Sequence, residues 1–313
     1  FFGNLENVIS VRDQFRQAGF DTTQLIRILR NNPDLSPLAT NGVTPKVDAS
    51  RIGYFGVSLG AMEGTIAAAM EPNVKAWFLD VNAGSLFDEL IAHSPAIGSV
   101  VSAGAAFSFG IVGDVFTWSH PFLQVLENIA EAGDPISYAP YLTLHPQPLA
   151  GVATSPRNAL QTEVIWDDVV SDEANEAIAR AAGWGMATPN VGSNADLAGA
   201  TVADATNNPR ATPFVQISPD ANGVIQDTPV KGATAVLVQV GPAEHGIDVV
   251  AGTGQHYFQV PYAPPFVRLD TPVPFKQQYQ TEEQMGLTFF SDAFSGVVPR
   301  VMHLPTVVRD ETN

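Results

Sequence analysis

An α/β fold with a mostly parallel sheet and helices on both of its faces is predicted by two features of the sequence. Short apolar segments typical of strands buried on both faces recur at residues 51–57, 74–82, 159–167 and 233–241. The intervals between them hold apolar residues at helical spacing and are long enough for the crossovers that parallel strands require.

The first element is expected to be an amphipathic helix over residues 6–30, because its apolar residues recur at helical spacing. These residues are Val8, Val11, Phe15, Ala18, Leu25, Ile28 and Leu29. The strand at 51–57 continues directly into residues 59–70, "LGAMEGTIAAAM", which we interpret as a helix of small residues.

Helices are also expected in the later part of the chain. Residues 83–150 contain short apolar segments broken by Gly and Pro, which indicates a helical cap. A helix follows the third strand and ends at Gly183, since glycine commonly terminates helices. One further helix is expected around residues 282–294.

The elements divide the chain into four expected parts. Residues 1–82 form the first part of the core, and residues 83–150 form the helical cap inserted into it. Residues 151–260 form the second part of the core, with an irregular insertion at 184–231 that is rich in Asn, Pro, Gly and Thr. Residues 261–313 are a tail with one helix.

Composition excludes several classes of function. The formal net charge of −17 argues against nucleic acid and anionic membranes as partners. The absence of cysteine excludes disulfides, thiolate metal sites and a cysteine nucleophile. Residues 95–113 are uncharged, but their Gly, Ala and Ser content favours an apolar cap segment over a membrane span.

Ser58 stands in the pattern Gly-x-Ser-x-Gly between the first strand and the helix that follows it. In such a turn the serine takes a strained backbone conformation, and we expect both flanking glycines to be required because side chains would strike the neighbouring elements. The turn presents the serine oxygen at a helix N-terminus, where developing negative charge is favoured. The alternative is an ordinary helix cap by Ser58.

A nucleophilic serine needs a histidine as base and an acid that orients the histidine. His245 is the first choice for the base because it follows the fourth strand within a few residues, and His256 is the second choice. Packing or surface positions suffice for His93, His120, His145 and His303.

The acid is sought just past the third strand, in "VIWDDVVSDEA". Asp167 and Asp168 both lie there, and adjacent residues point in different directions. Asp80 is a weaker candidate. Asp172 is most simply a first-turn charge of the following helix.

With these motifs the chain resembles the α/β-hydrolase superfamily, and within it the bacterial extracellular lipases related to virulence-factor lipases. The residues that carry the resemblance are "VRDQFRQ" (11–17), "DASRIGYFGVSLGAMEG" (48–64), "IWDDVVS" (165–171) and "GPAEHG" (241–246). The family's D-x-V-V-P segment falls on Asp167, with Ser171 in place of the proline, so the resemblance favours Asp167 over Asp168. Val57 and Ala61 stand where lipases often have His and Gly.

The resemblance implies ester hydrolysis by a Ser58–His245–Asp167 triad, with the backbone N–H of Leu59 as one oxyanion donor. It implies a pocket for an apolar acyl group under the cap, with candidate lining residues Val57, Phe107, Phe109, Phe116 and Trp118. No metal or cofactor is expected, because no cluster shows ligand spacing. A secreted, cell-surface or periplasmic location is also implied, although no signal peptide is visible in the chain.

Two alternatives remain open at this stage. The first is a binding or structural module on the same fold, and the second is an amidase or peptidase that uses the same triad. Upstream of Ser58 the sequence has no apolar strand followed by a Gly-rich turn, which in this fold supplies the second oxyanion donor. We therefore expect the N-terminal strands to come from an upstream segment or a second polypeptide.

Overall fold

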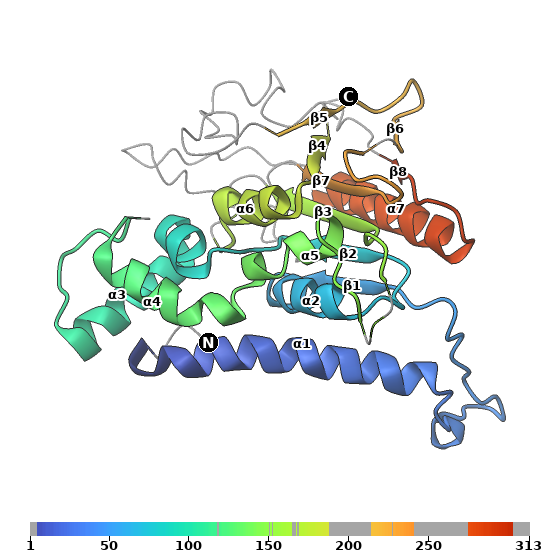
Figure 1. Ribbon diagram of the computed structural model, residues 1–313, viewed down its shortest axis with the longest axis horizontal. Helices are drawn as coiled ribbons and strands as arrows, with labels where there is room; N and C mark the ends of the chain where they lie inside the picture. The colour runs from blue at the N-terminus through green and yellow to red at the C-terminus, as the bar shows by residue number, and fades with distance from the viewer. Residues whose placement is uncertain are drawn as a thin grey trace.

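A six-stranded parallel sheet forms the centre of the protein in the computed structural model (Figure 1). The structure describes residues 5–117, 119–149, 151, 153–164, 167, 169–187, 214–226, 228–240 and 275–302, with the backbone alone for residues 95, 240 and 275–283. In spatial order the strands are β1 (Tyr54–Val57), β2 (Trp77–Asp80), β3 (Ala159–Val164), β7 (Ala235–Val240), β4 (Gly185–Ala187) and β5 (Gln216–Ile217). A small antiparallel pair, β6 (Val224–Ile225) and β8 (Val301–Met302), stands apart from this sheet.

Seven α-helices and several shorter helical turns are found in the described part of the chain. The α-helices are α1 (Val8–Arg30), α2 (Leu59–Met70), α3 (Pro95–Phe109), α4 (Pro121–Ala130), α5 (Pro140–Thr143), α6 (Asp172–Ala182) and α7 (Phe275–Phe294). The shorter turns are η1 (Leu5–Asn7), η2 (Ser36–Leu38), η3 (Leu86–Ile91), η4 (Glu131–Gly133) and η5 (Pro135–Ser137), of which η3 is a π-helix.

Alternate residues of the strands supply two separate hydrophobic clusters, one on each face of the sheet. Trp77 and Leu79 of β2 pack in a cluster with residues of α2 and α6. Phe78, between them, packs with Phe289 of α7 on the other face. Figure 1 shows α7 on one side of the sheet and α2 on the other, with α1 outside α2. The fold class is therefore α/β, as the sequence predicts.

Helix α1 approaches α2 closely because Gly19 has no side chain. A Cβ atom at this position would lie 2.5 Å from Ile66 of α2. The helix begins with a cap in which the Asn7 side chain accepts a hydrogen bond from the Ser10 N–H at 3.2 Å. Val8, Val11 and Phe15 of the predicted apolar face are buried, but Leu25 and Ile28 are exposed, so the face is confirmed only in the first half of the helix.

The predicted elements differ from the observed ones mainly at their ends. Helix α2 has its predicted bounds, whereas each of the four predicted strands is longer than the paired segment that the structure describes. Residues 184–231 are not wholly irregular, since β4 and β5 extend the main sheet. These strands are too short to show an apolar repeat. Helix α7 starts at Phe275, earlier than predicted, because its first turns consist of polar residues without apolar periodicity.

The cap region between β2 and β3 is helical, as predicted. It contains η3, α3, α4, η4, η5 and α5, and Figure 1 shows α3 and α4 beyond one end of the sheet. Helix α3 carries most of the uncharged stretch and has only 15 residues. Among the helices that the structure describes, none is both long enough and apolar enough to span a membrane.

Candidate functional site

Ser58 occupies a strained turn between β1 and α2. Its backbone angles are φ 54° and ψ −118°, in a region that residues other than glycine rarely adopt. The Ser58 N–H donates to the Asp80 carbonyl at 2.9 Å, which ties the turn to the end of β2. The Ser58 side chain makes no capping hydrogen bond to α2, so the helix-cap interpretation is wrong. Such strain is characteristic of functional turns.

The two glycines that flank Ser58 differ in their steric roles. A Cβ atom on Gly56 would lie 2.5 Å from the carbonyl oxygen of Gly60, so the turn requires glycine at position 56. A Cβ atom on Gly60 would meet only the Tyr54 hydroxyl, at 4.0 Å. The expectation that both glycines are sterically required is therefore wrong for Gly60, where a Cβ atom would make only this ordinary van der Waals contact.

Tyr54 also stabilises the turn that contains Ser58. Its hydroxyl donates to the Gly60 carbonyl at 2.6 Å, and its ring packs against Trp77 with the centroids 5.0 Å apart. Burial, followed by the negative charge of Glu63, raises the pKa of the Tyr54 hydroxyl to about 12. The phenol therefore stays protonated and remains a donor across the physiological pH range.

The carboxyl ends of β1, β3 and β7 meet at one edge of the sheet. Val57 pairs with Asp80, Asp80 with Thr162, and Thr162 with Val238. The carboxyl ends of these parallel strands therefore lie at the same level of the sheet. Ser58 and Asp167 follow β1 and β3 at this edge. This is the edge at which open α/β sheets bind ligands.

Asp167 is held rigidly in the loop after β3. Its side chain is buried, and Oδ1 accepts hydrogen bonds from the N–H groups of Val169 (2.8 Å) and Val170 (3.1 Å). Its own N–H donates to the Val164 carbonyl at 3.3 Å. These bonds fix the carboxylate at the sheet edge that also carries Ser58.

Several predicted residues lie outside the described residues. His245, His256, His303, Asp168 and Trp118 belong to this group. Strand β7 ends at Val240, so His245 follows it after a short interval in the sequence. The predicted partnership of Ser58, Asp167 and His245 therefore remains a prediction.

The other acid candidates have different surroundings. Asp172 is the first residue of α6, whose cap is Ser171, so Asp172 is a first-turn charge as predicted. Asp80 is completely buried at the end of β2, and its carboxylate accepts a hydrogen bond from the Thr162 hydroxyl. Its side chain lies one strand closer to Ser58 than the loop of Asp167 does.

A buried polar layer beside this edge was not predicted from the sequence. Glu163 on β3 accepts a hydrogen bond from the Gln239 side chain at 2.7 Å. Burial, and then the charges of Glu176 and Asp172, raises the pKa of Glu163 well above its ordinary value. The signal was the polar run Gln161-Thr162-Glu163 inside a strand otherwise expected to be apolar.

The predicted acyl-pocket residues are distributed unevenly. Phe116 is a buried member of the hydrophobic cluster beside the Ser58 turn, and Val57 packs against this cluster. The rings of Phe109 and Phe116 both contact the ring of Phe122. The Phe107 side chain is 92% exposed. Phe107 therefore lies on the outer face of α3, apart from this cluster, and its predicted contact with the substrate stays a prediction.

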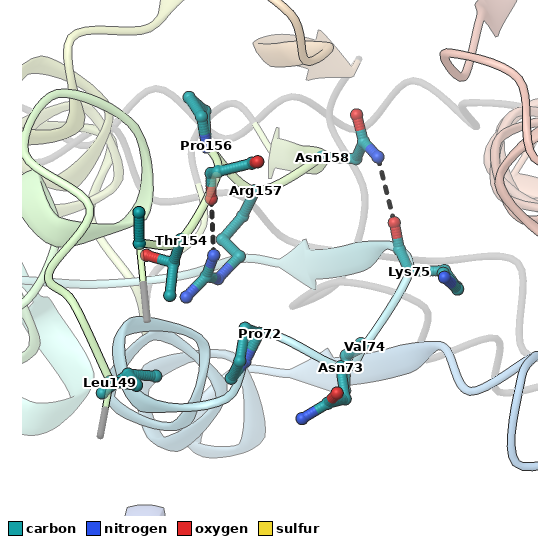
Figure 2. Close-up of a pocket in the computed structure, with 11 residues that line it drawn as sticks. Pro72, Asn73, Val74, Lys75, Leu149, Thr154, Pro156, Arg157 and Asn158 are labelled. Carbon is teal, nitrogen blue, oxygen red and sulfur yellow. Dashed lines mark hydrogen bonds between the residues drawn. The ribbon is translucent and has the colours of Figure 1, made fainter. Parts of the chain in front are cut away.

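A cavity of about 430 Å³ opens at the opposite edge of the sheet, at the amino ends of β2 and β3 (Figure 2). Arg157 lies in its wall, where Nε donates to the Ala68 carbonyl at 3.0 Å and Nη1 to the Ser155 carbonyl at 2.5 Å. Asn158 donates to the Lys75 carbonyl at 3.0 Å. These bonds fasten the loop before β3, and the cavity is remote from the Ser58 edge.

We predict that Asp167→Asn lowers kcat far more than Asp168→Asn does. An asparagine cannot stabilise the imidazolium or enforce the required tautomer, whereas a neighbouring carboxylate contributes only its field. Steady-state kinetics of both variants on one ester measures the difference. Equal, modest losses in the two variants would contradict the assignment, and Asp80→Asn would then be the variant to compare.

No protein-family model matches the chain, and no curated protein matches it in sequence. Among solved structures, acetyl xylan esterase 1 from Thermoanaerobacterium sp. is similar at 18% identity and a TM-score of 0.34, over 52% of this chain and 42% of that protein. An acylaminoacyl peptidase from Pyrococcus horikoshii is similar at 12% identity and a TM-score of 0.34, over 67% of this chain and 22% of that protein. A puromycin-hydrolyzing peptidase from Mycobacterium tuberculosis is similar at 12% identity and a TM-score of 0.30, over 64% of this chain and 20% of that protein. This chain thus spans less than half the length of each of these proteins.

Proposed function

We propose that this protein is a serine hydrolase of the α/β-hydrolase type that cleaves carboxylic esters. The observation that carries the proposal is the Ser58 turn, with its strained backbone and a side chain that is not used to cap the helix. The buried Asp167 at the same sheet edge, and the histidine that follows β7 in sequence, supply the other parts of a triad.

In the proposed reaction the Ser58 oxygen attacks the ester carbonyl while His245 takes the hydroxyl proton. His245 then gives this proton to the leaving alcohol as the bond between the acyl carbon and the alcohol oxygen breaks. Water attacks the resulting acyl-enzyme, and a proton returns to Ser58 as the carboxylic acid leaves. Asp167 orients the imidazole throughout.

The backbone N–H of Leu59 is the proposed first oxyanion donor. Leu59 is the first residue of α2, so its N–H has no acceptor within the helix and lies at the positive end of the helix dipole. Electrostatic stabilisation of this kind is usually the largest single contribution to acyl transfer.

A panel of p-nitrophenyl esters of increasing acyl length tests the proposed activity, with the matching p-nitroanilides as the amide comparison. Turnover of the esters, with little turnover of the anilides, is the expected result. Efficient anilide cleavage would favour the amidase or peptidase alternative. No turnover of either series, from folded protein, would favour a binding module. The proposed secreted or cell-surface location is tested separately by fractionation of the source cells.

We propose in addition that the free edge of β1 receives one more strand, which brings the second oxyanion donor. Among the described residues β1 pairs only with β2. The N–H groups of Tyr54 and Ser58 bond to β2, so the alternate residues Phe55 and Val57 direct their backbone groups to the other side. A parallel strand there would end beside Ser58. An upstream segment or a second polypeptide is the proposed source.

We therefore predict that residues 1–313 expressed alone turn over esters about 10²- to 10³-fold more slowly than an enzyme with both donors. The amides of Phe55 and Val57 should exchange rapidly with solvent in this preparation, since edge groups lack partners. Hydrogen exchange and kcat on one ester are the measurements. A soluble monomer with ordinary turnover and protected amides at these two positions would refute the added strand.

A further inference from the structure

Two buried carboxyl groups hold the start of η3 in the cap region. The Asp134 side chain, which is completely buried, accepts hydrogen bonds from the N–H groups of Ser85 (3.0 Å), Leu86 (2.6 Å) and Ile136 (2.8 Å). The Glu127 side chain accepts one from the Phe87 N–H at 2.8 Å. Three consecutive N–H groups of one segment are thus bound by two acids on other segments.

The two carboxyl groups are also near neighbours, and each shifts the pKa of the other. Two adjacent buried carboxylates repel each other, and this favours a proton on one of them. Burial raises the pKa of Asp134 as well, but its three N–H bonds stabilise the anion, so we assign the proton to Glu127. Burial, and then the charge of Asp134, raises the pKa of Glu127 to about 9.

No basic side chain among the described residues neutralises the two carboxyl groups. No ion pair of the described residues involves either carboxyl group. The titratable groups on the elements packed around the pair are predominantly acidic, and Asp88 raises the pKa of Glu127 further. They are Asp88, Glu89 and His93 in and after η3, His120 before α4, Glu131 and Tyr138 near η4 and η5, Arg12, Asp13 and Arg16 on α1, Glu63 and Glu71 at α2, and Asp172, Glu173, Glu176 and Arg180 on α6.

Segment η3 lies in the hydrophobic cluster that flanks Ser58. Leu86, Phe87 and Leu90 are buried members of this cluster, and Val57 and Leu59, on either side of Ser58, pack against it. The segment is a π-helix that begins after Ser85, a residue with φ 57°. Both features cost energy and depend on the surrounding contacts.

We propose that the Glu127–Asp134 pair is a positioning device that holds η3 in the apolar wall beside Ser58 and releases it when Glu127 ionises. The catalytic consequence rests on the proposed hydrolase function, whereas the release of η3 does not. When Glu127 ionises, two adjacent buried carboxylates repel each other, and the bonds to Ser85, Leu86 and Phe87 weaken.

The pH window follows from the direction of the shift. An acid whose folded-state pKa is raised contributes stability that is fully present below its unfolded pKa, near 4.5, and is lost as pH rises through about 9. We therefore expect KM for a p-nitrophenyl octanoate to rise several-fold between pH 8 and 10. The rise for the acetate should be smaller, because a short acyl group makes less contact with the apolar wall.

The variant Glu127→Gln tests the proposal, since its amide keeps one donor and one acceptor in place but does not titrate. In the wild type, protection of the Ser85, Leu86 and Phe87 amides, corrected for the intrinsic exchange rate, should fall with a midpoint near pH 9. In Glu127→Gln this fall and the KM increase should both disappear. Glu131→Gln is the matched control, because it removes one exposed carboxylate nearby and should retain the wild-type pH profile.

A second variant leaves the pair intact. Asp88→Asn removes a negative charge that raises the pKa of Glu127, so the midpoint of amide exposure should move to lower pH. An identical alkaline loss of protection in the wild type, Glu127→Gln and Asp88→Asn would overturn the proposal. If the variants shift exchange as expected but no protein hydrolyses esters, the positioning device stands and the proposed function fails.

Discussion

Ser58→Ala is expected to lower kcat for ester hydrolysis by about 10⁴- to 10⁶-fold while the protein remains folded. The loss is large because the triad acts as a unit, so removing the nucleophile removes the contribution of its partners as well. Folding should be retained because the Ser58 side chain does not cap α2, and the turn is held by backbone bonds to Asp80, Ala61 and Met62.

Two measurements decide this prediction. Steady-state kinetics and thermal unfolding are compared for Ser58→Ala and for Ser155→Ala, an exposed serine at the opposite edge of the sheet that serves as the control. A serine-directed phosphonate should add one label to the wild type, at Ser58, and none to Ser58→Ala. Full activity in Ser58→Ala, or a label on another serine, would remove the central claim.

His245→Ala is expected to cost about as much as Ser58→Ala, for the same reason. Without the imidazole the Ser58 proton has no acceptor and the leaving alcohol has no donor. His256→Ala is the matched variant, since it removes the second-choice histidine from the same region of the sequence and should retain activity. Kinetics on one ester compares the two. Inactivation by His256→Ala alone would transfer the role of base to that residue.

The strands and helices that the sequence predicted well are those with strong local signals. Helix α2 follows its strand directly and consists of small residues, and both of its ends were predicted correctly. Helix α6 ends at Ala182 and is capped by Gly183, whose φ of 74° is a conformation that glycine adopts readily. Strands β4 and β5 were missed because segments of two or three residues carry no periodicity, and their pairing depends on distant neighbours.

The candidate site divides in the same way. The pattern around Ser58 predicted its turn, because the requirement for a strained residue between a strand and a helix is local. The different roles of Gly56 and Gly60 were not predictable, since they depend on how the helix leaves the turn. The exposure of Phe107 was also not predictable. An aromatic residue in an apolar stretch is expected to be buried, and the sequence does not show which face of α3 it occupies.

The sequence by itself determined the fold class, the strained serine at the end of the first strand and the order of the candidate acid and base. These follow from hydrophobic periodicity and turn chemistry, which act over a few residues. Only the tertiary structure decided that β1, β3 and β7 end at one edge, and that the buried carboxyl groups of Glu127 and Asp134 bind the N–H groups at the start of η3. Both depend on residues far apart in the chain, and a carboxyl group's protonation is set by burial and neighbouring charges that exist only once the chain has folded.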